Sequence, residues 1–283
     1  MGKNEEWRNV NNEVTVHPTA VVHPTAELDT GVEIGPYAVI GEQVRIGKGT
    51  RVASHAVIDR WVTIGKGCDI FQFTSIGAPP QDLQYRGEET VTVIGDNNVI
   101  REYVTIHRAT IKEEKKTVIG DNNLLMAYVH IAHDSRIGNN VIMANAATLG
   151  GHVVIEDHVI VGGLVAVHQF VRLGAHSIIG GASAVSKDVP PYVLAVGNRA
   201  HLYGLNRVGL RRHGFTREDI NDIKRAYNII FRSSLPITES LDRLKAEMPD
   251  SVHARCFIDF IGAAKRGVAK ERGKKRGDGH EAD

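Results

Sequence analysis

Aliphatic residues recur at every sixth position along most of this 283-residue chain, and short polar segments separate them. An α-helix repeats its apolar positions with a period near 3.6 residues and an amphipathic strand with a period of 2, so neither explains a period of six. Short strands joined by corners do explain it, because each segment then points one aliphatic side chain inward. The positions in phase are Val16, Val22, Leu28, Ile34, Ile40, Ile46, Val52, Ile58, Ile64, Ile70, Ile76, Ile94, Ile100, Ile106, Ile119, Leu125, Ile131, Ile137, Met143, Leu149, Ile155, Val161, Val167, Leu173, Ile179 and Val185.

Three such segments close one triangular coil of 18 residues, so the pattern predicts an all-β solenoid. Glycine often follows the aliphatic position, as in Ile34-Gly35, where we expect it to supply the backbone freedom of a tight corner. Two insertions break the register, at residues 77–93 and 108–118. Loops that leave a rigid solenoid commonly carry function. For the second insertion, a tolerated surface loop is an equally good interpretation.

The last coil is expected to end at Pro190 and Pro191, because proline supplies no donor to a strand ladder. The segment that follows has helical spacing, and the final residues are Gly, Lys, Arg and Glu with almost no apolar content, which is typical of disorder. The sequence therefore predicts a β-helix domain over residues 1–192, a helical domain over residues 193–264 and a disordered basic tail over residues 265–283.

Within the helical segment, Thr216 and Asp219 form a capping-box pattern at a helix start. An apolar stripe at helical spacing follows it. Two shorter helices are expected near residues 238–248 and 251–262, separated by proline.

Composition narrows the class of protein. Lys plus Arg (34) nearly balance Asp plus Glu (33), so nucleic acid or an anionic membrane surface is not expected as the main partner. The only two cysteines, Cys68 and Cys256, have no metal-ligand spacing and indicate a reducing compartment. No segment approaches the roughly 20 apolar residues of a membrane span. These features predict a cytoplasmic protein without a disulfide framework.

Histidines gather on one strip of the predicted prism. Residues 18 apart lie on the same face of successive coils, about 4.8 Å apart, so His133 lies beneath Gly151, and Asp134 beneath His152. Correction for the second insertion places one further histidine beside His133. The histidines of the strip are His107, His130, His133, His152 and His168, together with Asp134 and Gln169.

This strip has the composition of a catalytic site. An imidazole is largely neutral yet basic at cellular pH, which suits a general base. Gly151 offers a backbone N–H unobstructed by a side chain, which suits an oxyanion donor. Asp134 follows His133 directly, and the two side chains meet only if a corner lies between them, because neighbours on a strand point to opposite faces.

At these residues the chain resembles the UDP-N-acetylglucosamine acyltransferases, a family of hexapeptide-repeat acyltransferases. The resemblance covers residues 14–262. It rests on the strings TIHR (105–108), HIAHD (130–134), GGHV (150–153), AVHQF (166–170), QDLQY (81–85) and GNRAHLYGLNRVGLRRHGF (197–215). It implies a left-handed parallel β-helix with a C-terminal α-helical domain. The handedness comes from the resemblance alone.

The resemblance also implies an activity, namely transfer of a 3-hydroxyacyl group from acyl carrier protein to the 3-hydroxyl of UDP-N-acetylglucosamine, the first step of lipid A biosynthesis. On this basis His133 is the general base, Asp134 orients it and the Gly151 N–H stabilises the oxyanion. No metal is implied, and no cofactor beyond the phosphopantetheine of the carrier protein. The family is trimeric, with sites in clefts between subunits.

Other positions match substrate-binding residues of the family. Asp82, with Gln81 beside it, matches a sugar contact, and Gly181 matches the floor of the acyl pocket. The remaining matches to substrate-binding positions are His107, His130, His152, His168, Gln169, Asn206 and Arg212. The last two belong to the segment that holds the uridine diphosphate in the family.

Two departures from the family pattern bear on nucleotide binding. Gln84 stands where the family usually has Lys, and His213 where it often has a second Arg. A lost cation weakens a charge-assisted contact to pyrophosphate.

A sugar acceptor with a 3-amino group in place of the 3-hydroxyl remains open, as do three other classes of protein. One is the related N-acyltransferase of the same pathway, although that enzyme carries an extra domain before its solenoid and this repeat begins by Val16. Another is a β-helix hydratase that binds zinc through three histidines between subunits. The third is an inactive scaffold.

Overall fold

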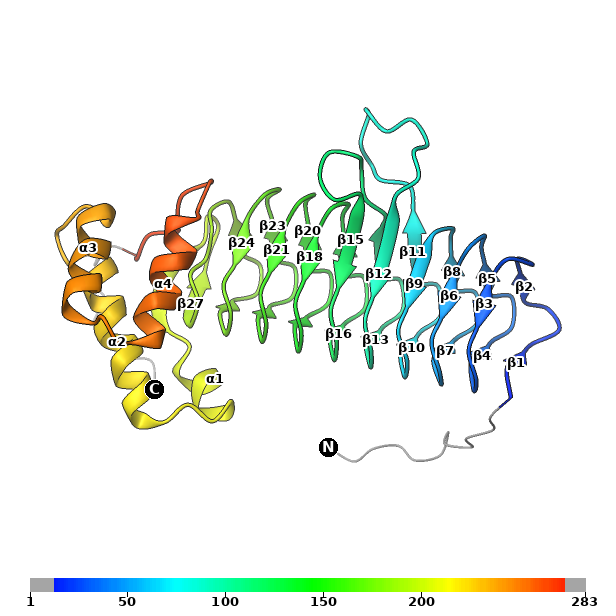
Figure 1. Ribbon diagram of the computed structural model, residues 1–283, viewed down its shortest axis with the longest axis horizontal. Helices are drawn as coiled ribbons and strands as arrows, with labels where there is room; N and C mark the ends of the chain where they lie inside the picture. Colours follow the sequence, from blue (N-terminus) through cyan, green and yellow to red (C-terminus); the bar gives the residue numbers. More distant parts are fainter. Residues whose placement is uncertain (1–12, 273–283) are drawn as a thin grey trace.

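The structure is a computed structural model that describes residues 13–272, and residues 1–12 and 273–283 lie outside the described part. Within the described residues, 28 short strands are followed by four helices. Along the solenoid, up to its last strands, each strand pairs in parallel with the strand three places further on, so that Val16 lies beside Ile34. Three sheets of 11, 9 and 8 strands form the faces of a long prism (Figure 1). The predicted left-handed parallel β-helix with C-terminal helices is confirmed.

The strands divide among three sheets, named here A, B and C. Sheet A contains β1 (Thr15–Val16), β4 (Glu33–Ile34), β7 (Arg51–Val52), β10 (Asp69–Ile70), β13 (Val99–Ile100), β16 (Leu124–Leu125), β19 (Ile142–Met143), β22 (Ile160–Val161), β25 (Ile178–Ile179), β27 (Val193–Val196) and β28 (His201–Leu205). Sheet B contains β2 (Val21–Val22), β5 (Val39–Ile40), β8 (Val57–Ile58), β11 (Ser75–Ala78), β14 (Thr105–His107), β17 (His130–Ile131), β20 (Thr148–Leu149), β23 (Ala166–Val167) and β26 (Ala184–Val185). Sheet C contains β3 (Glu27–Leu28), β6 (Arg45–Ile46), β9 (Val62–Ile64), β12 (Val91–Ile94), β15 (Lys116–Ile119), β18 (Arg136–Ile137), β21 (Val154–Ile155) and β24 (Arg172–Leu173).

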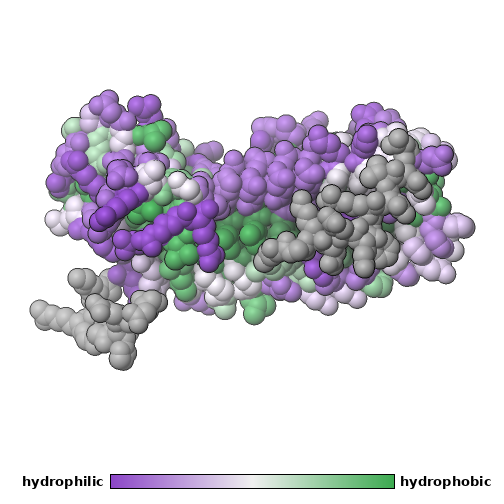
Figure 2. Space-filling view, turned by 90° about the horizontal axis from the view of Figure 1, so that it is seen from below, coloured by the Kyte–Doolittle hydropathy of each residue, from purple (hydrophilic) through white to green (hydrophobic). Residues whose placement is uncertain are grey.

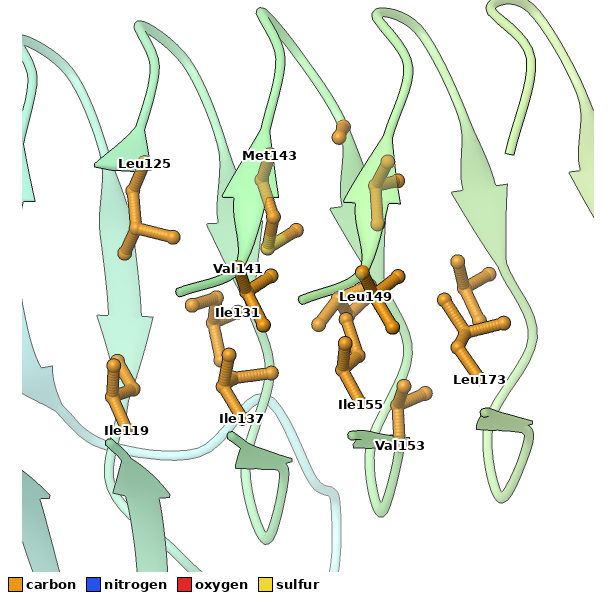
Figure 3. Close-up of a cluster of buried hydrophobic side chains, with 14 of the residues drawn as sticks. Ile119, Leu125, Ile131, Ile137, Val141, Met143, Leu149, Val153, Ile155 and Leu173 are labelled. Carbon is orange, nitrogen blue, oxygen red and sulfur yellow. The ribbon is translucent and has the colours of Figure 1, made fainter. Parts of the chain in front are cut away.

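The predicted aliphatic positions form the core of the prism. All of them lie in strands, and from Ile34 to Val185 each is at most 4% exposed. Figure 3 shows Leu125 and Met143, from neighbouring strands of sheet A, and Ile131 of sheet B pointing into the interior. Burial of an aliphatic side chain of this size contributes about 1.5–3 kcal/mol, so the stacked rows stabilise every coil.

The glycines after the aliphatic positions have a different cause from the predicted one. The left-handed conformation falls two residues later, as at Tyr37 (φ 57°) and His152 (φ 61°), and mostly not on glycine. A Cβ atom on Gly35 would lie 2.9 Å from the backbone nitrogen of Ser54 in the next coil. The glycine is therefore needed for the close approach of two coils, and the prediction of corner freedom at this position is wrong.

The solenoid continues past the two prolines, so its predicted end is wrong. Sheet A gains β27, which pairs in parallel with β25, and then β28, which pairs antiparallel with β27. Pro191 occupies a corner position, and the ladder bond there is donated by the next residue, from Tyr192 N to Ala175 O at 2.9 Å. Sheet C ends at β24, so no later strand of that sheet needs a hydrogen bond from the N–H that Pro190 lacks.

The C-terminal helices are α1 (Arg207–Arg212), α2 (Arg217–Phe231), α3 (Ile237–Glu247) and α4 (Val252–Gly262). The capping box at the start of α2 is confirmed, because the Thr216 side chain accepts from Asp219 N and the Asp219 side chain accepts from Thr216 N. Tyr227 of α2 and Phe257 of α4 are fully buried and form the core between these helices.

Part of the expected disordered tail is ordered. Val268 bridges to Asp188 and Glu271 to Leu202, and Ala269 is only 4% exposed. The chain up to residue 272 therefore packs back onto the end of the solenoid. The rest of the predicted tail lies outside the described residues.

Candidate active site

Both insertions leave the prism at the same edge, where sheet B turns into sheet C. They connect β11 to β12 and β14 to β15, and Figure 1 shows them as the two loops that project from the solenoid. In the coils that follow, the corners of this edge carry His133, His152 and Gln169. A pocket of about 640 Å³ lies between the loops and these corners. Its lining residues are Gln81, Asp82, Leu83, Gln84, Lys112, Glu113, His133, His152, Gln169 and Phe170.

A hydrogen-bonded pair of His133 and Asp134 stands at this pocket. The His133 Nδ1 atom lies 2.8 Å from Asp134 Oδ2. Asp134 has a φ of 60°, which makes it the left-handed corner residue of its coil. The corner brings two consecutive side chains together that a straight strand would separate.

Asp134 is held in place by the second insertion and is 2% exposed. It accepts hydrogen bonds from Thr110 N (3.1 Å) and Thr110 Oγ1 (2.8 Å), while its own N–H donates to Thr117 Oγ1. Burial raises the pKa of Asp134, but the hydrogen bonds from His133 and Thr110 outweigh burial and the pKa lies below its usual value. An ionised carboxylate only accepts, so His133 Nδ1 is the donor, and in the neutral ring the lone pair is on Nε2.

The imidazole of His133 lies directly against Gly151. A Cβ atom on Gly151 would be 2.5 Å from His133 Cε1 and 2.8 Å from Nε2, so only glycine leaves room for the ring. Asp96 and Asp121 hold the same place in the six-residue repeat but at a different edge, where sheet C turns into sheet A, and their N–H groups donate to side chains of the next coil at 2.7 and 2.8 Å. No described residue accepts from the Gly151 N–H.

The other histidines of the strip have separate environments. His107 and His130 make an edge-on ring contact with centroids 4.9 Å apart. Burial, followed by the charge of His130, lowers the pKa of His107 to about 4, so its imidazole is neutral. His152 stacks on Phe170 at 4.5 Å. His168 is exposed, with Nδ1 3.1 Å from the carbonyl oxygen of Gln169.

Charged groups of the two loops meet across the pocket. Lys112 Nζ lies 2.7 Å from Asp82 Oδ2, and this hydrogen bond holds the pKa of Asp82 below its usual value. Glu113 Oε1 lies 3.1 Å from His152 Nδ1, without the alignment of a hydrogen bond. The second insertion therefore lines the pocket, and its interpretation as a bland surface loop is wrong.

Sequence reasoning missed two pocket residues, Lys112 and Glu113, and the Asp134 partner Thr110. Thr110, Lys112 and Glu113 lie in a segment that breaks the six-residue period, so the stacking rule assigns them no neighbours. Lys112 also places a cation in the pocket that Gln84 lines, where the departure from the family pattern had removed one. The run of charges between residues 112 and 116 was the one available signal.

Six predicted substrate-binding residues do not line this pocket in the single chain. Three of them are His107, His130 and His168, whose environments are given above, and the other three lie elsewhere in the chain. Asn206 caps the start of α1 and donates from Nδ2 to the carbonyl oxygen of His176. Arg212 is exposed in the last turn of α1. Gly181 lies at the corner between β25 and β26, on another edge of the prism, away from this pocket. The roles of these residues stay predictions.

A triangular solenoid with a histidine-carboxylate pair at a loop-lined corner defines the class of hexapeptide-repeat transferases. The family model described as "Bacterial transferase hexapeptide (six repeats)" matches residues 116–151, and the one described as "Udp N-acetylglucosamine O-acyltransferase; Domain 2" matches residues 188–269. The model described as "GMPPB C-terminal domain" matches residues 10–118.

Curated and solved relatives cover nearly the whole chain. The acyl-(acyl-carrier-protein)–UDP-N-acetylglucosamine O-acyltransferase of Thermodesulfovibrio yellowstonii is 55% identical over 255 residues, which are 90% of this chain and 99% of that protein. The UDP-N-acetylglucosamine acyltransferase structure from Francisella novicida is 41% identical, covers 91% of this chain and 94% of its own, and has a TM-score of 0.89. The Arabidopsis enzyme of the same name is 38% identical over 90% of this chain and 100% of its own, with a TM-score of 0.82. The chain belongs to the UDP-N-acetylglucosamine O-acyltransferase family.

The helices of the described part, residues 13–272, include none with the length and apolar character needed to cross a membrane.

Proposed function

We propose that this chain transfers a 3-hydroxyacyl group from acyl carrier protein to the 3-hydroxyl of UDP-N-acetylglucosamine, the first step of lipid A biosynthesis, in the cytoplasm. One observation carries the proposal. The imidazole of His133, held through Nδ1 by Asp134, packs against Gly151, whose N–H has no acceptor among the described residues. The names of the relatives support the choice of donor and acceptor.

In the proposed reaction His133 Nε2 removes the proton of the acceptor hydroxyl while the hydroxyl oxygen attacks the thioester carbonyl carbon. The ionised Asp134 stabilises the imidazolium that forms. The carbonyl oxygen becomes an oxyanion, to which the Gly151 N–H donates. When the C–S bond breaks, the proton on His133 passes to the departing sulfur of the phosphopantetheine. No metal and no further cofactor takes part in this sequence.

The acceptor would bind over the loop residues of the pocket. Asp82 accepts a hydrogen bond from a sugar hydroxyl, and Gln81 and Gln169 offer amide groups from either side of the pocket. Lys112 supplies positive charge near the nucleotide. His107, His130 and His168 complete the strip on which the substrate lies.

A homotrimer would complete the site, because Asn206, Arg212 and Gly181 then reach the pocket from a neighbouring subunit. Figure 2 shows an apolar stretch on one face of the solenoid between polar surfaces. Large exposed apolar areas of this kind commonly mark protein interfaces.

The proposal is tested by supplying purified chain with UDP-N-acetylglucosamine or with its 3-amino counterpart, and with carrier-protein thioesters of graded acyl length. We expect an ester product from the 3-hydroxyl sugar at the higher kcat/KM. Preferential formation of an amide from the 3-amino sugar would assign the chain to N-acyl transfer. If neither the ester nor the amide forms with any of the thioesters, acyl transfer is refuted.

A further inference from the structure

A second group of histidines lies on another edge of the prism, where sheet C turns into sheet A. His158 and His176 occupy corner positions in successive coils, after β21 and β24. His213 follows the end of α1 as its C-cap residue. The helical domain thus brings the third imidazole onto two imidazoles of the solenoid.

The three rings converge with their nitrogens close together. One ring nitrogen from each of the three residues lies within 4.8 Å of the others. The closest pair is His176 Nδ1 and His213 Nδ1, at 3.1 Å. Two ligands of a tetrahedral zinc ion, each with a Zn–N distance of about 2.05 Å, are separated by about 3.3 Å. The closest pair already has nearly this spacing, and the His158 nitrogen, within 4.8 Å of both, would have to approach by at most about 1.5 Å to become the third ligand.

From this arrangement we propose that His158, His176 and His213 bind a divalent transition metal ion such as Zn²⁺, with water completing the coordination. Three neutral imidazoles form a donor set that suits zinc, copper and nickel.

Two of the three histidines have lowered pKa values. Burial, followed by the charge of neighbouring His158, lowers the pKa of His176 to about 4 and holds the pKa of His213 below its usual value. Asp157 opposes the shift at His176 only in part. His176 and His213 are therefore neutral at pH 7, which is the form that ligates a metal.

The ion would fasten α1 to the solenoid at its second end. The first end is already fixed, because the side chain of Asn206 donates to the carbonyl oxygen of His176 at 2.9 Å. The second end meets the ring of the same residue through His213. A metal bridge would therefore hold both ends of the helix that carries Arg212, independently of whether the proposed acyl transfer is correct.

A competing explanation is plain ring stacking along the edge. The rings of His158 and His176 are nearly parallel, with centroids 4.7 Å apart, and Tyr192 extends the stack. Stacking alone predicts no specific affinity for a metal, so direct binding separates the two explanations.

The full chain, stripped with a chelator and dialysed, is titrated with Zn²⁺ by calorimetry and with Co²⁺ by visible absorption. Wild type should bind one ion per chain at this cluster. His158→Ala, His176→Ala and His213→Ala should each raise the Kd at least tenfold. Zn²⁺ should raise the Tm of wild type and not that of His213→Ala, an exposed position where the substitution leaves the core intact.

Two controls locate the binding. His55→Ala removes a stacked corner histidine of another edge and should leave the Kd unchanged. His152→Ala tests the other cluster with metal-ligand spacing, formed by His133, Asp134 and His152. The proposal fails if wild type binds no Zn²⁺, or if binding is lost in His152→Ala and retained in the three cluster variants.

Discussion

A single methyl group added at Gly151 should disable His133 while the chain stays folded. In Gly151→Ala the new Cβ would lie 2.5 Å from His133 Cε1 and 2.8 Å from Nε2. Carbon atoms in contact prefer about 3.5–4.0 Å, so the imidazole has to retreat by about 1 Å or rotate. The φ of Gly151 is outside the left-handed region, so alanine causes no backbone strain there.

The displaced ring loses its 2.8 Å bond to Asp134 and its position beside the oxyanion donor. Loss of a positioned general base typically costs 10²–10⁴ in rate, which is about 3–5 kcal/mol of transition-state stabilisation. We expect kcat to fall by about this factor, with KM little changed because the loop contacts to the substrate remain.

The assay combines turnover with thermal unfolding and a double-mutant cycle. If alanine acts through His133, adding Gly151→Ala to His133→Ala should cost almost nothing further. A folded Gly151→Ala enzyme that keeps turnover within about threefold of wild type would refute the reasoning. Additive losses in the double mutant would show that the methyl group acts elsewhere.

Three further expectations follow from the structure and the proposed chemistry. The pKa of His107 is about 4 in the folded chain against 6.5 in a free imidazole, so its contribution to the free energy of unfolding is fully present above pH 6.5 and falls by roughly 3 kcal/mol toward pH 4. In urea unfolding, His107→Gln should show a smaller loss of stability between pH 6.5 and pH 4 than wild type, and an equal loss in both proteins would contradict the prediction. Gly181→Met should shift acyl preference toward shorter chains in a competition among thioesters, with a modest loss of stability because a Cβ there lies 3.3 Å from Gly163 O; an unchanged length profile would remove Gly181 from the acyl pocket. At saturating substrate, kcat for acyl transfer should survive a chelator, because the proposed step uses only proton transfer and an N–H donor; a kcat lost on chelation and restored by zinc alone would contradict a metal-free step.

The coil geometry was readable from the sequence because each segment repeats one requirement, an inward aliphatic residue. From the sequence alone that rule predicts His133 under Gly151, and the structure places the imidazole against that glycine. The rule does not predict the contact between His133 and Asp134, which depends on the left-handed φ of Asp134. Many corner residues share that conformation, so the residue type alone does not reveal it.

The rest of the site depends on contacts with no local signal. Thr110 reaches Asp134 because the second insertion folds back over the edge of the prism, and an insertion has no register from which its path follows. The same holds for the last described residues, where Ala269 is buried because the segment around it forms β-bridges with Asp188 and Leu202. A composition poor in apolar residues predicted disorder there, and long-range pairing overrides it.

The central claim is that His133 performs acyl transfer as the general base, and turnover of His133→Ala tests it most directly. Carrier-protein thioester and UDP-N-acetylglucosamine are supplied at saturation, and circular dichroism verifies the fold of the variant. Because the side chain lies outside the aliphatic core, the fold should be retained while kcat falls by at least the 10²–10⁴ typical of a lost base. A folded His133→Ala enzyme with near-normal turnover would contradict the account.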